Sequence, residues 1–413
     1  MITATGVIVF SIIFVFLILF TIRKHSSALS RSEAALAFLF KVALGCLYGY
    51  LFITFYEGDD TWAIHAASIK EWELLKEDPL QFFWEFTPGT AMRNGRDFWQ
   101  TGAFYISDLE YCLQTKTLGL FNVISRGNYY INSVFFNFTV FWGHYWLFLL
   151  AIKYFPGRRR ILFLCIFFLP TAVFWLSGIR GDGMLFFFFS LLMLSFDRFL
   201  DSNKPGAALL SLVGFAGMII FRTPVAFLLL PALVSWWLIR RADKHPVIAF
   251  AAVYGISILL FFASSVVTGL NGPQAVANRQ AEYLLLKGNT RYELPVLQAD
   301  VAGFVSVFPY AFYNTFLRPT PWEAKGMLQL ASAAGVVLFW VIVVYSLVRR
   351  KPVTGPGSAF LWMLLLFGLT LYLLIGYTVP FPGAIVRYKS IGEMVVLVAL
   401  IGGLAKFPTF RRI

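Results

Sequence analysis

Two adjacent carboxylates, Asp59 and Asp60, follow directly on a long apolar run in the stretch YEGDDTWAIHAAS. A carboxylate at a helix start accepts hydrogen bonds from the open N–H groups of the first turn and suits the positive end of the helix dipole. One aspartate is enough for capping, so the second requires another role. It can act as a general base or bind a divalent cation such as magnesium or manganese, and the sequence leaves both roles open.

Cationic residues fall in other breaks between apolar runs. Arginine offers a planar set of donors that stays protonated, which suits a phosphate at a membrane interface. A snorkelling or headgroup contact explains any one of these residues equally well. Several cationic residues in such breaks require a common explanation, and a bound phosphate is the simplest one. The candidates for this phosphate site are Arg180, Arg222, Arg318, Arg387 and Lys389.

Three further polar residues complete the candidate site. Asp182 lies between two glycines and can pair with Arg180, whereas Glu323 can pair with Arg318 or contact a sugar. His65 is too far along the chain from the acidic pair to share its helical face closely, so we expect a secondary polar contact there. The 4 histidines form no HExxH pattern and the 3 cysteines form no metal-ligand spacing, which excludes a zinc protease and a zinc cluster.

The composition indicates a membrane protein. Hydrophobic residues make up 59% of the 413 residues and charged residues only 13%, which leaves too little polar surface for a water-soluble fold. In lipid the backbone groups must be satisfied within helices, so we expect an all-α polytopic integral membrane protein. The net charge of +13 falls in short clusters between apolar runs, which is typical of contact with membrane lipids and not of nucleic-acid binding.

Apolar runs of about 17 to 25 residues are long enough to cross a bilayer. The sequence predicts about eleven of them, at 3–22, 34–56, 129–154, 161–177, 183–200, 206–221, 224–239, 246–267, 327–348, 359–379 and 384–405. If the basic clusters are cytoplasmic, the N-terminus is outside and the C-terminus inside. No repeat or linker divides the chain, so we expect residues 1–413 to form a single transmembrane domain.

This orientation places two long loops on the extracytoplasmic side, residues 57–128 and 268–326. Both are rich in aromatic residues, leucine and proline, which predicts amphipathic helices that lie along the membrane interface. In TWAIHAASIKEWELLKED the apolar residues recur at near-helical spacing with charges between them. We therefore expect a helix here, with the acidic pair at its N-terminus.

An acidic pair that opens an interfacial helix in a long first outer loop resembles the GT-C superfamily of membrane glycosyltransferases. The first loop of that family commonly contains D-[DE]-x-x-Y-x-x-x-A. Asp59, Asp60 and Ala67 match this pattern, while Ala63 stands at the aromatic position. Trp62, one place earlier, can stand in for that aromatic residue.

A second resemblance lies in the middle of the chain. The stretch FLPTAVFWLSGIRGDG, residues 168–183, is similar to P-x-x-x-F-W-x-S-G-[IL]-x-K-[DE] in bacterial membrane proteins of the GT-C and polysaccharide-polymerase type. Gly181 replaces the lysine of that pattern, with Arg180 beside it. The later segments FLRPTPWEA (316–324) and GAIVRYK (383–389) are similar to the same group.

The resemblance implies a GT-C-like fold and a transferase of the bacterial inner membrane. Such an enzyme moves a sugar from a polyprenyl-phosphate or polyprenyl-diphosphate carrier to a saccharide, lipid or protein acceptor on the extracytoplasmic face. Asp59 or Asp60 would deprotonate the acceptor hydroxyl, and the cationic residues would hold the donor phosphate. An in-line displacement would invert the anomeric centre.

Other activities stay open. A polysaccharide polymerase or ligase would rely on the outer arginines more than on an acidic base. A lipid-linked saccharide flippase or another transporter would carry charged groups within several helices, and the apolar runs of this chain contain few of them. A non-catalytic assembly partner is also compatible with motifs as short as these.

Overall fold

The structure is a computed structural model of the 413-residue chain. It describes all residues except 1, 26–27, 86–97, 243–244, 267–270, 289, 325, 350, 352 and 405–413. The described residues form helices and connecting turns, and no β-strand occurs among them. The predicted all-α class is therefore confirmed for this part of the chain.

Eight helices in the described ranges are long and apolar enough to cross a membrane. They are Thr3–Arg23, Arg31–Phe55, Tyr129–Tyr154, Gly181–Ser202, Pro205–Arg241, Pro246–Val266, Met327–Val348 and Pro356–Thr378. Two shorter apolar helical stretches, Val301–Leu317 and Ser390–Gly402, accompany them. Length and hydropathy of these helices identify a polytopic integral membrane protein.

The chain divides into two compact units, Met1–Leu150 with Val173–Ala226, and Ala151–Ala172 with Phe227–Ile413. Helices α7, α9 and α11 contribute residues to both units. The prediction of one domain over residues 1–413 concerns independent folding and stays a prediction.

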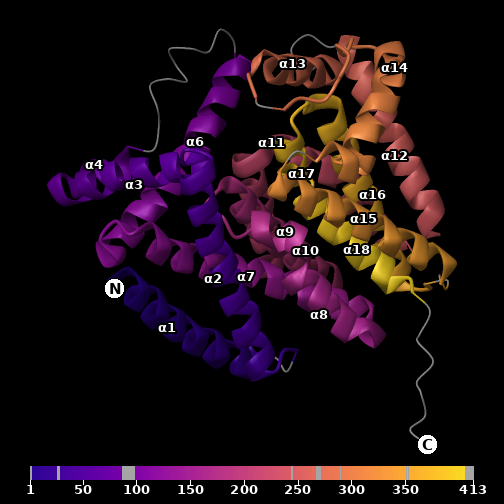
Figure 1. The fold of residues 1–413 in the computed structure, drawn as a ribbon. Helices are drawn as coiled ribbons and strands as arrows, with labels where there is room; N and C mark the ends of the chain where they lie inside the picture. The colour runs from indigo at the N-terminus through magenta and orange to yellow at the C-terminus, as the bar shows by residue number, and fades with distance from the viewer. Residues whose placement is uncertain are drawn as a thin grey trace, which may run out of the picture. The chain divides into compact units, whose positions relative to one another are not determined.

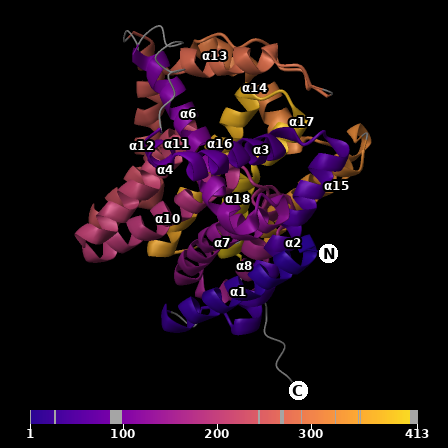
Figure 2. The same cartoon turned by 90° about the vertical axis from the view of Figure 1, so that its left-hand side faces the viewer.

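The first unit consists mainly of six helices and parts of three more, of which α9 contributes only its end (Figure 1). The others are α1 (Ile2–His25), α2 (Arg31–Phe55), α3 (Asp59–Glu77), α4 (Pro79–Trp84), α6 (Phe98–Ser125), α10 (Gly181–Ser202), most of α7 (Tyr129–Tyr154) and the first part of α11 (Pro205–Ala242). Helix α3 packs along α6, as both views show (Figures 1 and 2). The helix predicted to follow the acidic pair is therefore present.

Close helix packing in the first unit depends on glycine. A Cβ atom on Gly45 of α2 would lie 2.3 Å from the side-chain nitrogen of Asn137 in α7, and one on Gly49 would lie 2.1 Å from the ring of Tyr129. Small residues allow helices to approach closely where lipid supplies no hydrophobic driving force. Lys41 of α2 and Asn137 of α7 can therefore both donate to the turn at Leu176–Ser177.

The second unit contains the remaining helices. They are η1 (Pro156–Arg158), α8 (Arg159–Phe168), α9 (Pro170–Trp175, in part), α12 (Pro246–Ala263), η2 (Ser264–Val266), α13 (Gly272–Leu285), α14 (Val301–Phe312), the π-helix η3 (Tyr313–Leu317), η4 (Pro321–Glu323), α15 (Met327–Val348), α16 (Pro356–Thr378), α17 (Pro382–Tyr388) and α18 (Ser390–Gly402). Helix α16 packs against both α18 and α14. A Cβ atom on Gly376 of α16 would lie 2.2 Å from the carbonyl oxygen of Ala311 in α14.

The predicted break between two of the spans lies inside one long helix, α11. The runs 206–221 and 224–239 belong to α11, in which Arg222 alone has non-helical angles, φ −160° and ψ 82°. Pro224 lacks an N–H group and its ring clashes with the preceding turn. Two helical stretches therefore meet at a kink at Arg222, where the sequence predicts a break.

Another predicted span is two short helices. The run 161–177 divides into α8 and α9, because Leu169 takes an extended conformation, φ −65° and ψ 107°. Leu169 precedes Pro170, and a residue before proline is disfavoured in the helical region. The run 384–405 likewise divides at Lys389, between α17 and α18. The chain therefore has fewer long helices in its described part than the sequence predicts spans.

Both predicted outer loops contain helices. Residues 57–128 include α3, α4 and α6, and residues 268–326 include α13, α14, η3 and η4. Their position at a membrane interface stays a prediction.

Candidate functional site

The turn Leu176–Arg180 in the first unit is held by buried side chains. Lys41 of α2 donates from Nζ to the carbonyl oxygen of Leu176 at 2.9 Å and to Oγ of Ser177 at 3.1 Å. Asn137 of α7 donates from Nδ2 to the carbonyl oxygen of Ser177 at 2.9 Å. These bonds satisfy carbonyl groups left open beyond the end of α9. The turn therefore has a fixed backbone.

A second set of contacts positions Arg180. Thr61 of α3 donates to the carbonyl oxygen of Ile179 at 3.1 Å, and Nη1 of Arg180 donates to the Tyr48 hydroxyl at 3.3 Å. Residue 178 must be small, because a Cβ atom on Gly178 would lie 2.6 Å from the ring of Tyr48. Hydrogen bonds thus hold both the backbone before Arg180 and its guanidinium group.

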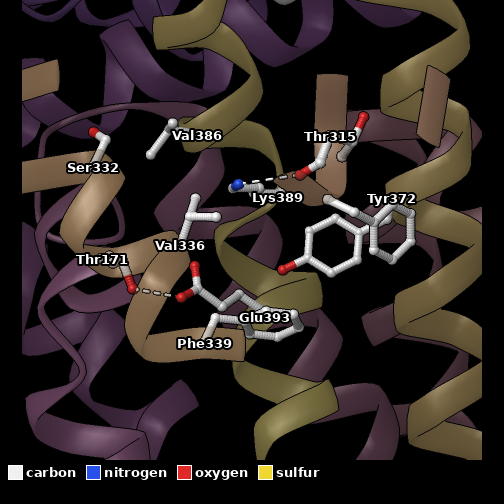
Figure 3. Close-up of a pocket in the computed structure, with 11 residues that line it drawn as sticks. Thr171, Thr315, Ser332, Val336, Phe339, Tyr372, Val386, Lys389 and Glu393 are labelled. Carbon is white, nitrogen blue, oxygen red and sulfur yellow. Dashed lines mark hydrogen bonds between the residues drawn. The ribbon is translucent and has the colours of Figure 1, made fainter. Parts of the chain in front are cut away.

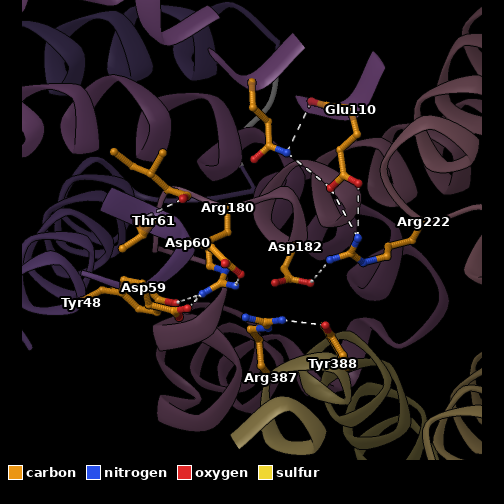
Figure 4. A network of polar contacts seen from close by, with 12 residues as sticks. Tyr48, Asp59, Asp60, Thr61, Glu110, Arg180, Asp182, Arg222, Arg387 and Tyr388 are labelled. Atoms are coloured by element: carbon orange, nitrogen blue, oxygen red, sulfur yellow. Dashed lines mark hydrogen bonds and ion pairs between the residues drawn. The ribbon is translucent and has the colours of Figure 1, made fainter. Parts of the chain in front are cut away.

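Arg180 joins the two aspartates (Figure 4). Its Nη1 donates to Oδ2 of Asp59 at 2.6 Å, and its Nη2 donates to Oδ2 of Asp60. The side chain of Arg180 is 5% exposed, that of Asp59 35% and that of Asp60 65%. The cation is therefore buried behind the carboxylates, and Asp60 is the member of the group that a substrate can reach most easily.

The backbone before the acidic pair is unusual. Glu57, Gly58 and Asp59 have φ angles of 53°, 97° and 46°, all in the left-handed region. Only glycine adopts this region without penalty. Gly58 is the N-cap residue of α3 and makes no side-chain capping bond. The two aspartates follow it in the first turn, where their side chains meet Arg180.

Arg222 forms a second, looser centre in the same unit. Its Nη1 donates to Glu110 of α6 at 3.3 and 3.5 Å, and its Nη2 lies 4.0 Å from Oδ1 of Asp182 (Figure 4). Charge-assisted N–H···O bonds are usually about 2.7 to 2.9 Å long. The side chain of Arg222 is 33% exposed. Its contacts are therefore easier to replace by those of a ligand than the contacts of Arg180.

Gly181 allows Glu110 to approach. A Cβ atom on Gly181 would lie 2.3 Å from Oε1 of Glu110. A side chain at this position, such as the lysine of the similar family pattern, would displace the carboxylate. Glycine at position 181 therefore leaves room for the Glu110 carboxylate.

The cluster in the first unit has more carboxylates than guanidinium groups: Asp59, Asp60, Glu110 and Asp182 against Arg180 and Arg222. Burial by itself lowers the pKa of Arg180. The charges of Tyr48, Asp182, Asp60 and Asp59 more than offset this effect, and the pKa is raised above its ordinary value. An anionic ligand must therefore compete with carboxylates for the arginines.

The geometry offers no ready metal site in the described residues. No group of three or more histidine, cysteine or acidic side chains among them could hold a metal ion. A divalent cation at Asp59 and Asp60 stays a prediction, in which water or substrate would supply the other ligands.

His65 belongs to a buried amide network. Its side chain is buried, and Nδ1 lies 3.5 Å from Nδ2 of Asn132 in α7. Asn132 in turn donates to Asn122 of α6 at 2.6 Å. Burial lowers the pKa of His65, although a hydrogen bond with the backbone of Gly127 acts in the opposite direction. This network holds α3 against α6 and α7.

The second unit contains the remaining predicted residues. Arg318 donates from Nε to Oε1 of Glu323 at 2.7 Å, from Nη2 to the same oxygen, and from Nη1 to Asn314 at 3.0 Å. Its guanidinium also lies 4.2 Å and 4.9 Å from the ring centres of Tyr292 and Tyr313. Every nitrogen of the fork has a partner, so a phosphate at Arg318 would have to displace Glu323 or Asn314.

The ion pair of Arg318 and Glu323 should make the stability of its segment sensitive to acid. Burial alone would raise the pKa of Glu323, but hydrogen bonds from Arg318 and Thr320 together with the charge of Arg318 outweigh it and lower the pKa. A carboxyl with a lowered pKa stabilises the folded state above its ordinary pKa, and this stability is lost as the pH falls through the lower folded value.

We therefore expect amide hydrogen exchange in residues 313–324, corrected for intrinsic rates, to accelerate as the pH falls below the ordinary pKa of glutamate, about 4.3. Glu323→Gln should remove most of this pH dependence. Glu282→Gln, on the exposed pair with Arg279, is the control and should leave it in place. The same acceleration in Glu323→Gln and wild type would contradict the assignment.

Arg387 lies in the last turn of α17, and Lys389 is the residue between α17 and α18. Arg387 donates from Nη2 to the Tyr388 hydroxyl at 2.7 Å, and its guanidinium lies 4.5 Å from the centre of that ring. Lys389 is buried and donates to the carbonyl oxygens of Thr315 and Arg318 at 3.2 and 3.4 Å. Arg387 is thus the more accessible of the two.

The predicted residues therefore fall into two sets. Asp59, Asp60, Arg180, Asp182 and Arg222 meet in the first unit, whereas Arg318, Glu323, Arg387 and Lys389 lie in the second. Sequence reasoning missed Glu110, because the face of α6 that meets Arg222 cannot be read from an isolated segment. No family model, curated protein or solved structure matches the chain.

Proposed function

We propose that the protein is a membrane glycosyltransferase that moves a sugar from a polyprenyl-linked phosphate or diphosphate to an extracytoplasmic saccharide, lipid or protein. The observation that carries the proposal is the cluster of the first unit, in which an exposed carboxylate, Asp60, is held by a buried arginine beside a second, partly exposed arginine. A base and a phosphate-binding cation are the two groups that this reaction requires.

The geometry supports distinct roles within the cluster. Asp60 is the reachable base, and Arg180 positions it together with Asp59. Arg222 takes the donor phosphate, because its present contacts are long. Negative charge grows on that phosphate as the glycosidic bond breaks, so a preorganised guanidinium stabilises the transition state more than the ground state.

The reaction that follows is a single displacement. The acceptor oxygen attacks the anomeric carbon and its proton passes to Asp60. The bond from that carbon to the phosphate oxygen breaks, and the phosphate leaves with the electron pair. Attack opposite the leaving group inverts the anomeric centre. The basic clusters and the family resemblance favour a site on the outer face of a bacterial inner membrane, with the N-terminus outside and the C-terminus inside.

The test is a complementation experiment in a deletion strain with analysis of its glycans and glycolipids. Asp60→Asn should abolish transfer at normal expression, because the amide cannot accept the proton, and Asp59→Asn should reduce it. Glu73→Gln, an exposed carboxylate of the same helix, is the matched control and should be fully active. Full activity of both aspartate variants would show that neither carboxylate acts as the base.

The same experiment distinguishes a transferase from the main alternative, a polysaccharide polymerase or ligase. Loss of one sugar residue from the product supports a transferase. Loss of chain length with intact repeat units supports a polysaccharide polymerase or ligase. In that case substitutions of Arg222 should be far more damaging than those of Asp59 or Asp60.

A further inference from the structure

A small cavity within the second unit is lined by polar groups from several helices (Figure 3). The polar residues at its wall are Thr171, Thr315, Ser332, Tyr372, Lys389 and Glu393. The space open to the centre of a water-sized sphere is about 10 Å³, which is close to the minimum that one water molecule needs. The cavity is thus too small for any larger ligand.

Two opposite charges face this cavity and do not touch. Lys389 and Glu393 are 5% and 4% exposed. Oε1 of Glu393 accepts a hydrogen bond from Thr171 at 2.8 Å, while Nζ of Lys389 donates to the carbonyl oxygens of Thr315 and Arg318. The described contacts of these two residues include no direct ion pair. Each group has capacity for a further hydrogen bond.

Two hydroxyl groups point to an occupant. Oγ1 of Thr315 lies in the cavity wall, is fully buried and has no hydrogen-bond partner in the described part of the chain. The hydroxyl of Tyr372, also buried, is directed into the space beside Glu393 (Figure 3). Buried polar atoms are rarely left unsatisfied, because an unmade bond costs about 1 to 3 kcal/mol. A single molecule that both donates and accepts would satisfy all four groups.

We propose that one water molecule occupies this cavity and bridges Lys389 to Glu393 as a water-mediated ion pair. The water accepts from Nζ of Lys389 and from the Tyr372 hydroxyl, and it donates to the Glu393 carboxylate and to Oγ1 of Thr315. A metal cation fits less well, because the ammonium of Lys389 repels it. This inference is independent of the proposed function.

The bridge has a consequence for the neighbouring segment. Lys389 donates to the carbonyl oxygens of Thr315, within the π-helix η3, and of Arg318, the residue that follows it. A cation at the carbonyl end of a helix stabilises that end. The water-bridged pair therefore fixes the backbone from which Arg318 extends, and it gives Lys389 a structural role in place of phosphate binding.

Charge removal tests the pairing. Glu393→Gln and Lys389→Met should each lower the midpoint of thermal unfolding in detergent by several degrees, because each leaves one buried charge without its counterion. The double variant should recover at least half of the summed loss, since it contains neither charge. Ser332→Ala is the control, because Ser332 lines the cavity but donates to its own helix at Leu328, and its midpoint should not change. Additive losses in the double variant would overturn the proposal.

Two further measurements on the folded protein test whether the water molecule is present and whether the bridge affects η3. An experimental density map that resolves ordered water should show a peak within hydrogen-bonding distance of both Nζ of Lys389 and the Glu393 carboxylate. A direct contact between the two side chains without such a peak would overturn the bridge. Hydrogen exchange in residues 313–318 should accelerate in Lys389→Met, and unchanged exchange would overturn the effect on η3.

Discussion

Replacement of Arg180 by lysine is expected to reduce sugar transfer by about 10²-fold, because a displacement of a catalytic group by about 1 Å can reduce the rate by that factor. Arg180 donates to Asp59, Asp60 and Tyr48 at once. A lysine keeps the charge but has a single nitrogen at its end, so it cannot replace a planar fork between two carboxylates. Asp60 would lose its fixed position although the net charge is unchanged.

The measurement is product formation by purified variants in lipid nanodiscs, with thermal unfolding measured in parallel. Arg198→Lys, an exposed arginine of α10, is the matched control and should retain activity. If Arg180→Lys were fully active, the idea that Arg180 positions the base would be wrong. An equal loss of activity and of folded protein would instead assign Arg180 to stability alone.

The second large effect is expected at Gly181. Alanine there would place its Cβ atom 2.3 Å from Oε1 of Glu110, so the flexible carboxylate must move away and its contact with Arg222 is lost. A hydrogen bond to a charged group contributes about 1.5 to 3 kcal/mol. Because Glu110 competes with the donor phosphate for Arg222, we expect its removal to tighten binding of the carrier by about 10- to 100-fold. The helix itself should tolerate alanine well.

A double variant isolates the cause. Glu110→Gln should tighten carrier binding by a similar factor, and Gly181→Ala combined with Glu110→Gln should bind no more tightly than the tighter single variant, because both remove one contact. Gly206→Ala is the control, since a Cβ atom at that glycine meets no atom within 4 Å. Multiplication of the two single effects would show that Gly181 acts by another route.

Sequence reasoning predicted the fold class because apolar length is a strong signal in lipid. The break that it predicted between 206–221 and 224–239 lies at the kink of α11, where Arg222 is non-helical, because Pro224 interrupts the hydrogen bonding of the preceding turn. It wrongly joined α8 to α9, because Leu169 and Pro170 lie in an unbroken apolar run. Run length therefore indicates lipid exposure better than it indicates helix ends.

The candidate site was partly readable. Asp59 and Asp60 stand out as charges at the end of an apolar run, and Arg180 stands out as a cation on a face expected to lack them. Glu110 gave no such signal, because a carboxylate on a polar helix is ordinary. Glu393 carries a signal in the sequence, because it is an acid inside the apolar run 384–405. A buried ionisable residue in such a run is a marker of a site.

The account depends most directly on the binding of a lipid phosphate by the cluster around Arg222. Native mass spectrometry of the protein in nanodiscs, titrated with polyprenyl phosphate and polyprenyl diphosphate, measures this. Saturable binding of one carrier is expected in wild type and in Asp60→Asn, with at least about tenfold weaker binding in Arg222→Ala, which lacks a charge-assisted donor pair. Equal binding by Arg222→Ala and wild type, or no saturable binding of either carrier, would contradict the account.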